Sequence, residues 1–171
     1  HAYHRRQRQM CIRDRKNALS PGTLSLERHR LLWIFLEKET DFFNTENKIL
    51  HIAPEQCFYK SFKKNFESYT TCDLNSPIAE IKADICNLPF DENEFDFILC
   101  NHVLEHVYDD EKAMKEIYRV LKHEGKAILQ VPVDNALEKT IDGRDISDQN
   151  LRNKLFGQYD HLRLYGPDYY N

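Results

Sequence analysis

Residues 84–133 read DICNLPFDENEFDFILCNHVLEHVYDDEKAMKEIYRVLKHEGKAILQVPV and carry the clearest alternation of strand and helix patterns in the chain. The aromatic and branched run 94–100 predicts a strand. Over 110–122, apolar residues recur at helical spacing between acids at the start and a lysine at the end, and Gly125 is expected to stop this helix. The apolar run 126–133 predicts a strand that is buried on both faces.

The same alternation extends upstream of this stretch. Helices are predicted at 25–40 and from Pro54 onward, and strands at 48–53, 68–74 and 82–85. Five strands separated by helical segments imply parallel crossovers, and therefore an α/β fold with a three-layer, doubly wound, Rossmann-like architecture and a mostly parallel sheet. The ligand crevice of such a fold lies at the carboxyl ends of the strands. In the polar tail, one helix is predicted at 147–156, ended by Gly157.

The composition of the chain indicates a single globular domain and argues against a membrane span and a nucleic-acid partner. The chain has 171 residues, 28 acidic and 24 basic side chains, a formal charge of −4 and 41% hydrophobic residues, which fits one domain. The longest apolar run, residues 31–36, is far shorter than the roughly 20 residues of a membrane span. A mildly acidic balance argues against a nucleic-acid partner. Five cysteines without a C-x-x-C motif indicate reduced thiols and a cytoplasmic protein.

The two ends of the chain look unlike the rest. Residues 1–17 are strongly basic and lack hydrophobic periodicity, so we interpret them as a non-native or disordered extension and assign the domain to 18–171. The final residues, YGPDYYN, follow a turn that should open another element. We therefore expect a domain that is incomplete at its C-terminus and lacks its last strands. The oligomeric state cannot be inferred from the sequence.

Two aspartates follow predicted strands and suit an adenosine-containing ligand. Asp73 ends the second strand, where one carboxylate can accept hydrogen bonds from both ribose hydroxyls. Asp84 ends the third strand and can accept from an adenine amino group, while the backbone of Ile85 contacts the ring edge. Each aspartate is also explained by an ordinary role in a turn or a helix cap.

The order of motifs in 84–133 resembles a known family. It is similar to the second half of class I S-adenosylmethionine-dependent methyltransferases of the small-molecule type, with a pattern like that of methyltransferase domain 11. The motifs follow in this order: D-I-x-x-L-P-F, an acid-rich turn, F-D in the fourth strand, V-L-E-H, a helix ending in R-V-L-K, and a glycine before the fifth strand. The resemblance covers roughly 48–134. SLERHRLLW, LHIAPE and YDHLRLYG resemble a bacterial subgroup. The resemblance implies S-adenosylmethionine as cofactor and an unidentified small-molecule acceptor.

The loop after the first strand departs from this family. In LHIAPEQC, His51 stands where an acid is usual, and Ala53, Glu55 and Cys57 stand where glycines are usual. A glycine-rich loop lets the backbone approach the methionine part of the cofactor, whereas Glu55 adds bulk and a charge that can pair with the ammonium or the sulfonium. The cofactor-binding residues implied by the resemblance are His51, Ala53, Glu55, Asp73, Leu74, Asp84, Ile85 and Asn101.

Two histidines follow the fourth strand at the expected crevice. The imidazoles of His102 and His106 suit a general base for methyl transfer, although a packing or capping role also explains either one. Glu105 can orient the donor or the substrate, although a solvated helix carboxylate is the simpler interpretation. A polar and aromatic group further along the chain is assigned to the acceptor side, with Arg163 holding an anionic substrate group; an ordinary surface loop is the alternative for these residues. The group comprises Tyr159, Asp160, His161 and Arg163.

Two other functions fit parts of the sequence. His102 to His106 match the H-x-x-E-H signature of inverted zinc peptidases, in which a helix places both histidines on one face. The motif is short and directly follows a buried strand, so no metal ligand is assigned. A noncatalytic adenosine-fold module, whose glycine-poor loop no longer binds cofactor, is the other alternative. Binding of S-adenosylhomocysteine distinguishes the module from the enzyme.

Overall fold

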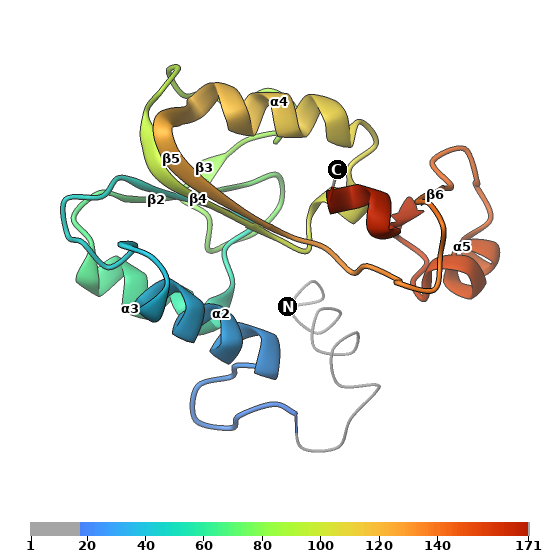
Figure 1. Cartoon of the computed structure of the whole chain (residues 1–171), viewed down its shortest axis with the longest axis horizontal. Helices are drawn as coiled ribbons and strands as arrows, with labels where there is room; N and C mark the ends of the chain where they lie inside the picture. Colours follow the sequence, from blue (N-terminus) through green and yellow to red (C-terminus); the bar gives the residue numbers. More distant parts are fainter. Residues whose placement is uncertain (1–17, 171) are drawn as a thin grey trace.

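A five-stranded parallel sheet with the order β3-β2-β1-β4-β5 forms the centre of the chain (Figure 1). The structure is a computed structural model and describes residues 18–170. The predicted three-layer, doubly wound α/β architecture is confirmed, because helices cover both faces of this sheet. The strands are β1 (Ile49–Ile52), β2 (Tyr69–Asp73), β3 (Ile81–Lys82), β4 (Phe95–Asn101) and β5 (Leu121–Gln130).

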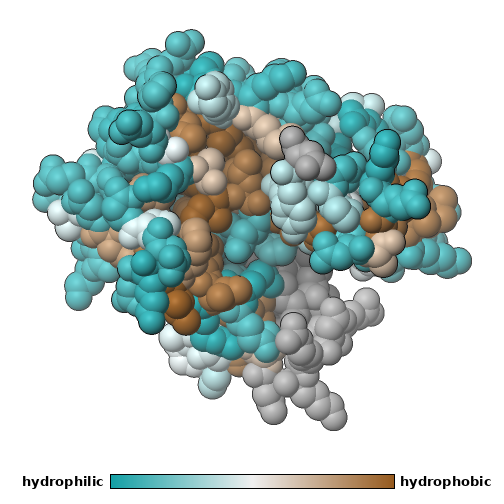
Figure 2. All heavy atoms as spheres, in the orientation of Figure 1, coloured by the Kyte–Doolittle hydropathy of each residue, from teal (hydrophilic) through white to brown (hydrophobic). Residues whose placement is uncertain are grey.

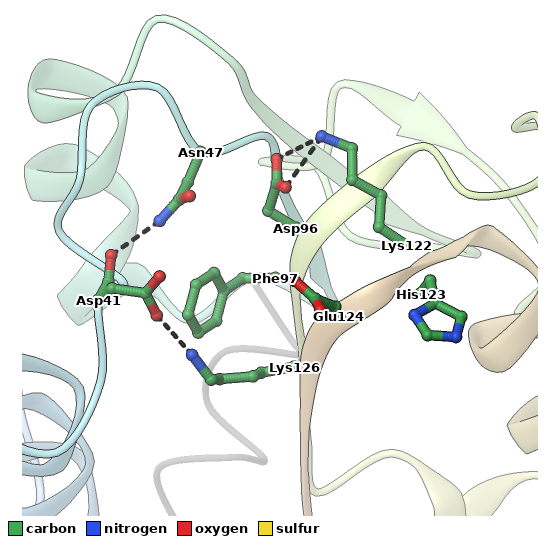
Figure 3. Close-up of a pocket in the computed structure, with 9 residues that line it drawn as sticks. Asp41, Asn47, Asp96, Phe97, Lys122, His123, Glu124 and Lys126 are labelled. Atoms are coloured by element: carbon green, nitrogen blue, oxygen red, sulfur yellow. Dashed lines mark hydrogen bonds and ion pairs between the residues drawn. The ribbon is translucent and has the colours of Figure 1, made fainter.

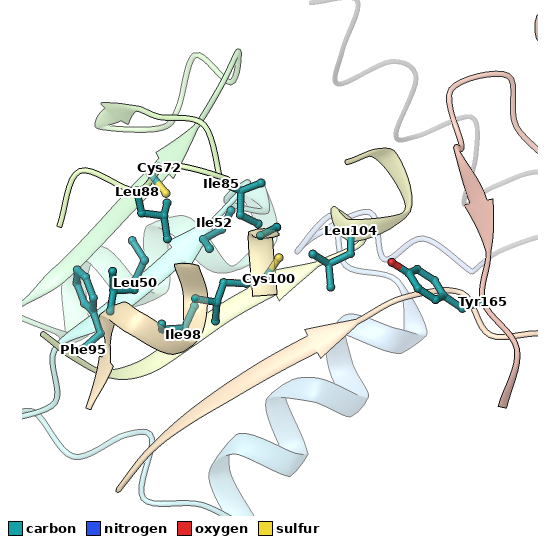
Figure 4. Close-up of a cluster of buried hydrophobic side chains, with 13 residues drawn as sticks. Leu50, Ile52, Cys72, Ile85, Leu88, Phe95, Ile98, Cys100, Leu104 and Tyr165 are labelled. Atoms are coloured by element: carbon teal, nitrogen blue, oxygen red, sulfur yellow. The ribbon is translucent and has the colours of Figure 1, made fainter. Parts of the chain in front are cut away.

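Side chains of the central strands alternate between the two faces of the sheet. In β1, Ile49 packs in the cluster that contains α2 (Glu27–Lys38) and α3 (Gln56–Asn65), whereas Leu50 packs in the cluster that contains α4 (Asp110–Val120). Figure 4 shows the second cluster, in which strand residues and Leu104 lie close together. Both faces of β1 and β4 are therefore buried, and the polar ends of these strands are left to form a site.

The junction between α4 and β5 differs from the prediction. The helix ends at Val120, and the strand starts at Leu121 in an extended conformation (φ −78°, ψ 134°), so Gly125 lies inside the strand and does not cap the helix. A Cβ at Gly125 would lie 2.8 Å from Leu121 Cδ1 and 3.0 Å from the carbonyl oxygen of Asp96. Close packing beside the irregular β4–β5 register, and not a left-handed turn, accounts for this glycine.

β5 is less buried than the sequence predicts. Its residues are mostly half-buried, because β5 is the last strand of the sheet within residues 18–170. Figure 2 shows apolar surface across the middle of the face on which β5 lies. An apolar run therefore predicted the strand correctly but not its burial, since burial depends on what lies next to the strand.

The start of α3 and the length of β3 also differ from the prediction. Pro54 precedes Glu55, the N-cap residue of α3, and is not the first residue of the helix. The predicted strand 82–85 shrinks to Ile81–Lys82, because Asp84 Oδ1 accepts a hydrogen bond from the Cys86 amide at 2.9 Å and bends the chain into a turn. This turn places Asp84 at the carboxyl end of β3.

The tail contains more structure than its polar pattern indicates. The predicted helix is α5 (Gln149–Phe156), ended by Gly157 in the left-handed conformation (φ 76°). The antiparallel pair β6 (Ile141–Asp142) and β7 (Arg163–Leu164) and the 3₁₀ helix η2 (Pro167–Tyr170) were not predicted. A bridge between Val133 and Tyr165 holds this region beside the end of β5.

Replacing Gly166 by alanine is expected to lower the free energy of unfolding by about 1–3 kcal/mol. The added Cβ would lie 2.7 Å from the carbonyl carbon of Lys139 and 2.9 Å from the amide nitrogen of Thr140, and backbone atoms cannot move aside as a flexible side chain can. Urea unfolding measures the effect. Gly22→Ala is the control, because its Cβ meets no atom within 4 Å. Equal stability of the two variants would contradict this packing.

Candidate functional site

The candidate site lies where β1 and β4, the two central strands, reach their carboxyl ends. The chain connects β1 onward to β2 on one side, and β4 to β5 on the other, so the strand order changes direction between them. In doubly wound sheets this switch point is where ligands bind. Ala53 follows β1 with φ 51°, and His102 follows β4 with φ 55°. Both loops thus leave the sheet through a residue in the left-handed backbone conformation, which residues other than glycine rarely adopt.

Asp73 and Asp84 stand at the carboxyl ends of β2 and β3, as predicted. Asp73 Oδ1 accepts a hydrogen bond from the Asn75 amide at 2.6 Å and a second from the Ser76 amide, and Oδ2 makes no hydrogen bond within residues 18–170. One carboxylate oxygen of each aspartate therefore shapes its turn, as the simpler interpretation expected, and Oδ2 of Asp73 is open to a ligand. Leu74 is 52% exposed, whereas the side chain of Ile85 packs in the core.

Glu55 connects the loop after β1 to two other elements. One carboxylate oxygen lies 2.8 Å from His29 Nε2 on α2, and the other accepts a 2.8 Å hydrogen bond from Asn101 Nδ2 at the end of β4. Burial would raise the pKa of Glu55, but His29, His51 and Asn101 together outweigh it and lower that pKa from 4.5 to about 2. Glu55 is therefore a buried anion at neutral pH, and its bond to Asn101 links the two strands of the switch point.

His51 lies beneath the loop and not at its surface. Its side chain is fully buried among Phe58, Phe62 and Tyr69, and its Nδ1 is 2.8 Å from the Tyr69 hydroxyl. Burial lowers the pKa of His51 from 6.5 to about 4, against the opposing charge of Glu55. The imidazole is thus a neutral core group that helps to hold β1 against β2, and it does not face the crevice in the way that the resemblance implied.

The segment after β4 gathers titratable side chains around a buried carboxylate. Glu105 is 1% exposed, and its Oε1 lies 3.3 Å from His102 Nδ1. Burial would raise the pKa of Glu105, but His102 and His106 outweigh it and lower that pKa. The ring of His106 meets the ring of His161 edge to face, with 4.8 Å between centroids. Two predicted groups of residues, one after β4 and one in the tail, therefore meet at a single place.

Arg163 departs from its predicted role. It is 2% exposed, and its guanidinium donates to the carbonyl oxygens of Leu104, Val107 and Tyr108 at 2.8, 2.6 and 3.0 Å. It also lies 3.3 Å from Asp110 Oδ1. These contacts occupy the guanidinium, so Arg163 fastens the tail to the segment after β4 and does not present its charge to an anionic substrate. The nearby Tyr159 is half-buried.

The local structure contradicts the basis of the zinc-peptidase alternative. That signature needs an α-helix that carries both histidines on one face. Here only Leu104–His106 is helical, as the single 3₁₀ turn η1, and His102 lies before it in the left-handed conformation. A tight turn after a buried strand cannot present the H-x-x-E-H residues as a helix would.

His29 and Gln158 are the site residues that the sequence analysis missed. His29 lies on α2, and its contact with Glu55 exists only because α2 packs beside the loop after β1. Gln158 precedes the predicted tail group and contacts His161 Nε2 at 2.7 Å. Both residues lie in the short stretches that resemble the bacterial subgroup or directly beside them, which is the one sequence signal that points to them.

A hollow at the opposite end of the sheet is separate from this site. It has a volume of about 510 Å³ and lies near the amino ends of β1 and β4 (Figure 3). Asp96 pairs there with Lys122 at 2.8 Å, and Asp41 pairs with Lys126. None of the residues that line it is one that the sequence assigned to a ligand.

The residues at the strand ends fit an adenosine ligand with a cationic amino-acid end. Asp73 offers a free carboxylate oxygen beside β2, and the backbone next to Ile85 is available near Asp84. Asn101 Oδ1 and Glu105 Oε2 are buried acceptors without a hydrogen-bond partner in the described part of the chain. Such orphaned acceptors favour a ligand that brings donors or positive charge.

No helix within residues 18–170 has the length and apolarity to cross a membrane.

Comparisons with known proteins find methyltransferases among the proteins that this chain resembles. Residues 45–129 match the family described as methyltransferase domain. A 2-phytyl-1,4-naphtoquinone methyltransferase of Nostoc punctiforme is 42% identical over 52 residues, covering 30% of this chain and 23% of that protein. A demethylmenaquinone methyltransferase of Staphylococcus carnosus is 42% identical over 53 residues, covering 31% and 22%. The aligned region thus spans about a quarter of these relatives.

Solved structures give the same fold. The YcgJ protein of Bacillus subtilis superposes with a TM-score of 0.59 at 18% identity, covering 84% of this chain and 65% of that one. A SAM-dependent methyltransferase of Archaeoglobus fulgidus superposes with a TM-score of 0.55 at 12% identity, covering 82% and 64%. At this identity the likeness supports the fold alone.

Proposed function

We propose that the chain is a class I S-adenosylmethionine-dependent methyltransferase, which the match of residues 45–129 to the methyltransferase domain supports, and that it transfers a methyl group from this cofactor to a small-molecule acceptor. The observation that carries the proposal is the pair Asp73 and Asp84, which stand at the carboxyl ends of two strands beside the switch point of the sheet. The quinone methyltransferases among the relatives support a small-molecule acceptor. The free thiols of Cys57, Cys72, Cys86 and Cys100 support a cytoplasmic location.

Each part of the site has a role in this proposal. The cofactor supplies an electrophilic methyl group on a positively charged sulfonium. Asp73 accepts hydrogen bonds from the ribose hydroxyls, and Asp84 and the Ile85 backbone contact the adenine. The buried negative charge of Glu55 and the free Oδ1 of Asn101 suit the ammonium end. Holding donor and acceptor in line supplies much of the rate enhancement of such a transfer.

The acceptor side lies beyond β4. His102 and His106 are the candidates for the group that takes the acceptor proton, and their side chains are 27% and 29% exposed. Tyr159 and His161 belong to the segment that lies against them. His102 is the better placed of the two histidines for this role, because the buried Glu105 carboxylate lies 3.3 Å from its Nδ1 and can hold the ring.

Calorimetric titration with S-adenosylhomocysteine tests the proposal. Wild-type protein is expected to bind it, and Asp73→Asn is expected to weaken binding at least tenfold. Asparagine keeps one oxygen for the Asn75 and Ser76 amides, so the turn survives while the ligand loses its carboxylate partner. Asp91→Ala, at an exposed position before β4, is the matched control and should bind as wild type does. Equal binding by Asp73→Asn and wild type would contradict this assignment.

The noncatalytic module is the second candidate. The hydrogen bond between Asn101 and Glu55 favours it, because this bond crosses the switch point where a glycine-rich loop would leave room for the ligand. A flat titration of folded wild-type protein would support the module. Glu55→Gly then distinguishes a blocked site from an absent one, since removal of the side chain should restore binding only if Glu55 obstructs it.

A further inference from the structure

Three potential metal ligands converge beyond the carboxyl end of β4, on the proposed acceptor side. One side-chain ligand atom each from Glu105, His106 and His161 lies within 4.8 Å of the other two. Glu105 and His106 belong to η1, whereas His161 comes from the tail, and the Leu162 amide donates a 2.8 Å hydrogen bond to the Glu105 carbonyl. The backbone therefore holds the two segments together independently of the side chains.

Glu105 is buried, and neither of its carboxylate oxygens has a hydrogen-bond partner among the described residues. Its side chain is 1% exposed, and Oε2 has neither a hydrogen bond nor an ionic partner in the described residues. Oε1 has only the contact with His102 at 3.3 Å. A buried carboxylate is costly unless it is paired and hydrogen-bonded or coordinates a metal. An acceptor with this burial, close to two imidazoles, thus points to a missing positive ligand.

The two histidines are prepared as ligands by their other ring nitrogens. His106 Nδ1 lies 3.2 Å from the Asp160 carbonyl oxygen, so this nitrogen carries the proton and Nε2 keeps a free electron pair. His161 Nδ1 is buried without a hydrogen-bond partner, and its Nε2 contacts the Gln158 amide at 2.7 Å. The nitrogen of the Gln158 amide faces Nε2; a half-turn of that amide would let Nε2 donate to the amide oxygen and would leave Nδ1 as the free ligand atom. Metal-binding histidines characteristically have such outer partners.

We propose that Glu105, His106 and His161 bind one divalent cation of the Zn²⁺ class. Two imidazoles and one carboxylate are a ligand set of borderline softness, which suits Zn²⁺ and other first-row transition ions and leaves open coordination positions. The cation would neutralise the buried charge of Glu105. This site replaces the expectation that the chain has no metal ligands: the H-x-x-E-H stretch supplies two of the three, and the tail supplies the third.

The cation has a role in methyl transfer that rests on the proposed function. An acceptor oxygen bound at an open position becomes more acidic, so its proton is lost more easily at neutral pH. In this arrangement His106 is a ligand, and His102 remains to receive the proton. The binding site itself does not depend on this role, because its ligands are distinct from Asp73 and Asp84.

Calorimetric titration of the chelator-treated full chain with ZnCl₂ alone tests the site. Wild type is expected to bind one Zn²⁺ at this site, and His161→Ala is expected to weaken that binding at least tenfold. His123→Ala is the control, because His123 is exposed at the other end of the sheet and removes one imidazole without touching the cluster. Binding through His1 and His4 is common to all three proteins and cancels in the comparison.

A second variant guards against a folding defect. His106→Asn changes a side chain that is 29% exposed, and circular dichroism checks that the fold persists. We expect this variant to lose Zn²⁺ affinity to the same extent while it still binds S-adenosylhomocysteine, whereas Asp73→Asn should show the reverse pattern. Equal Zn²⁺ affinity of wild type and both histidine variants would overturn the metal site and leave the proposed methyltransferase function intact.

Discussion

Arg163→Ala is expected to lower the free energy of unfolding by about 3–5 kcal/mol, the range typical of breaking a buried ion pair by removing one partner. Arg163 is 2% exposed, and Asp110 beside it is 9% exposed. The substitution would leave the Asp110 carboxylate with the Tyr165 hydroxyl, which donates at 2.7 Å, as its side-chain partner. It would also remove the donors to three backbone carbonyls after β4.

Urea unfolding monitored by circular dichroism measures this loss. Arg144→Ala is the matched control, because Arg144 also pairs with an aspartate, Asp142, but on the exposed surface. We expect little change in the control, since exposed ion pairs contribute little. Arg163→Lys should fall between the two, because one ammonium group keeps the charge but cannot replace the planar fork of donors. An Arg163→Ala protein as stable as the control would refute the fastening role.

Stability is expected to fall as the pH drops from 6.5 to about 4, because His51 resists protonation in the folded state. Its pKa is lowered from 6.5 to about 4, chiefly by burial. In this window the unfolded chain binds a proton that the folded chain does not, so stability rises with pH and is lost on acidification. The size of the effect is on the order of 3 kcal/mol. Glu55, with a pKa of about 2, extends the loss below pH 4.5 in the same direction.

Unfolding free energies of wild type and His51→Asn, measured at several pH values between 4 and 7, isolate this effect. Asparagine keeps a polar atom near the Tyr69 hydroxyl but does not titrate. The variant should therefore be less stable at pH 7 and show a shallower slope than wild type. His123→Asn, on the exposed part of β5, should keep the wild-type slope. Parallel slopes for wild type and His51→Asn would show that His51 is not the group responsible.

The strands and the ends of the strands were predictable from local patterns. Apolar runs located β1, β2, β4 and β5 within a few residues, and the rule that ligands bind at strand ends then located Asp73, Asp84 and the histidines after β4. The start of β5 was not predictable, because α4 passes directly into an extended Leu121 and Gly125 serves close packing. Local patterns do not distinguish a glycine that turns the chain from one that lets two segments approach.

Burial of polar residues was the main source of error at the site. His51 and Arg163 were both expected to face a ligand, yet both lie in the interior, where Nδ1 of His51 meets the Tyr69 hydroxyl and the guanidinium of Arg163 donates to backbone carbonyls. His29 was missed for a related reason. Its contact with Glu55 joins α2 to the loop after β1, and nothing in a helix pattern indicates which loop its polar side chain will meet.

The two parts of the proposed site differ in how they are built. The proposed nucleoside part is set by neighbouring strands of one sheet, whereas the proposed acceptor part needs the tail, since His106 meets the Asp160 carbonyl from 54 positions away. Detachment of residues 134–170 as a unit would therefore disrupt the proposed acceptor part and leave the ends of the strands in place. Under mild denaturant, the Leu162 amide should therefore exchange its hydrogen before the amides of β1 do, because the tail detaches before the central sheet unfolds.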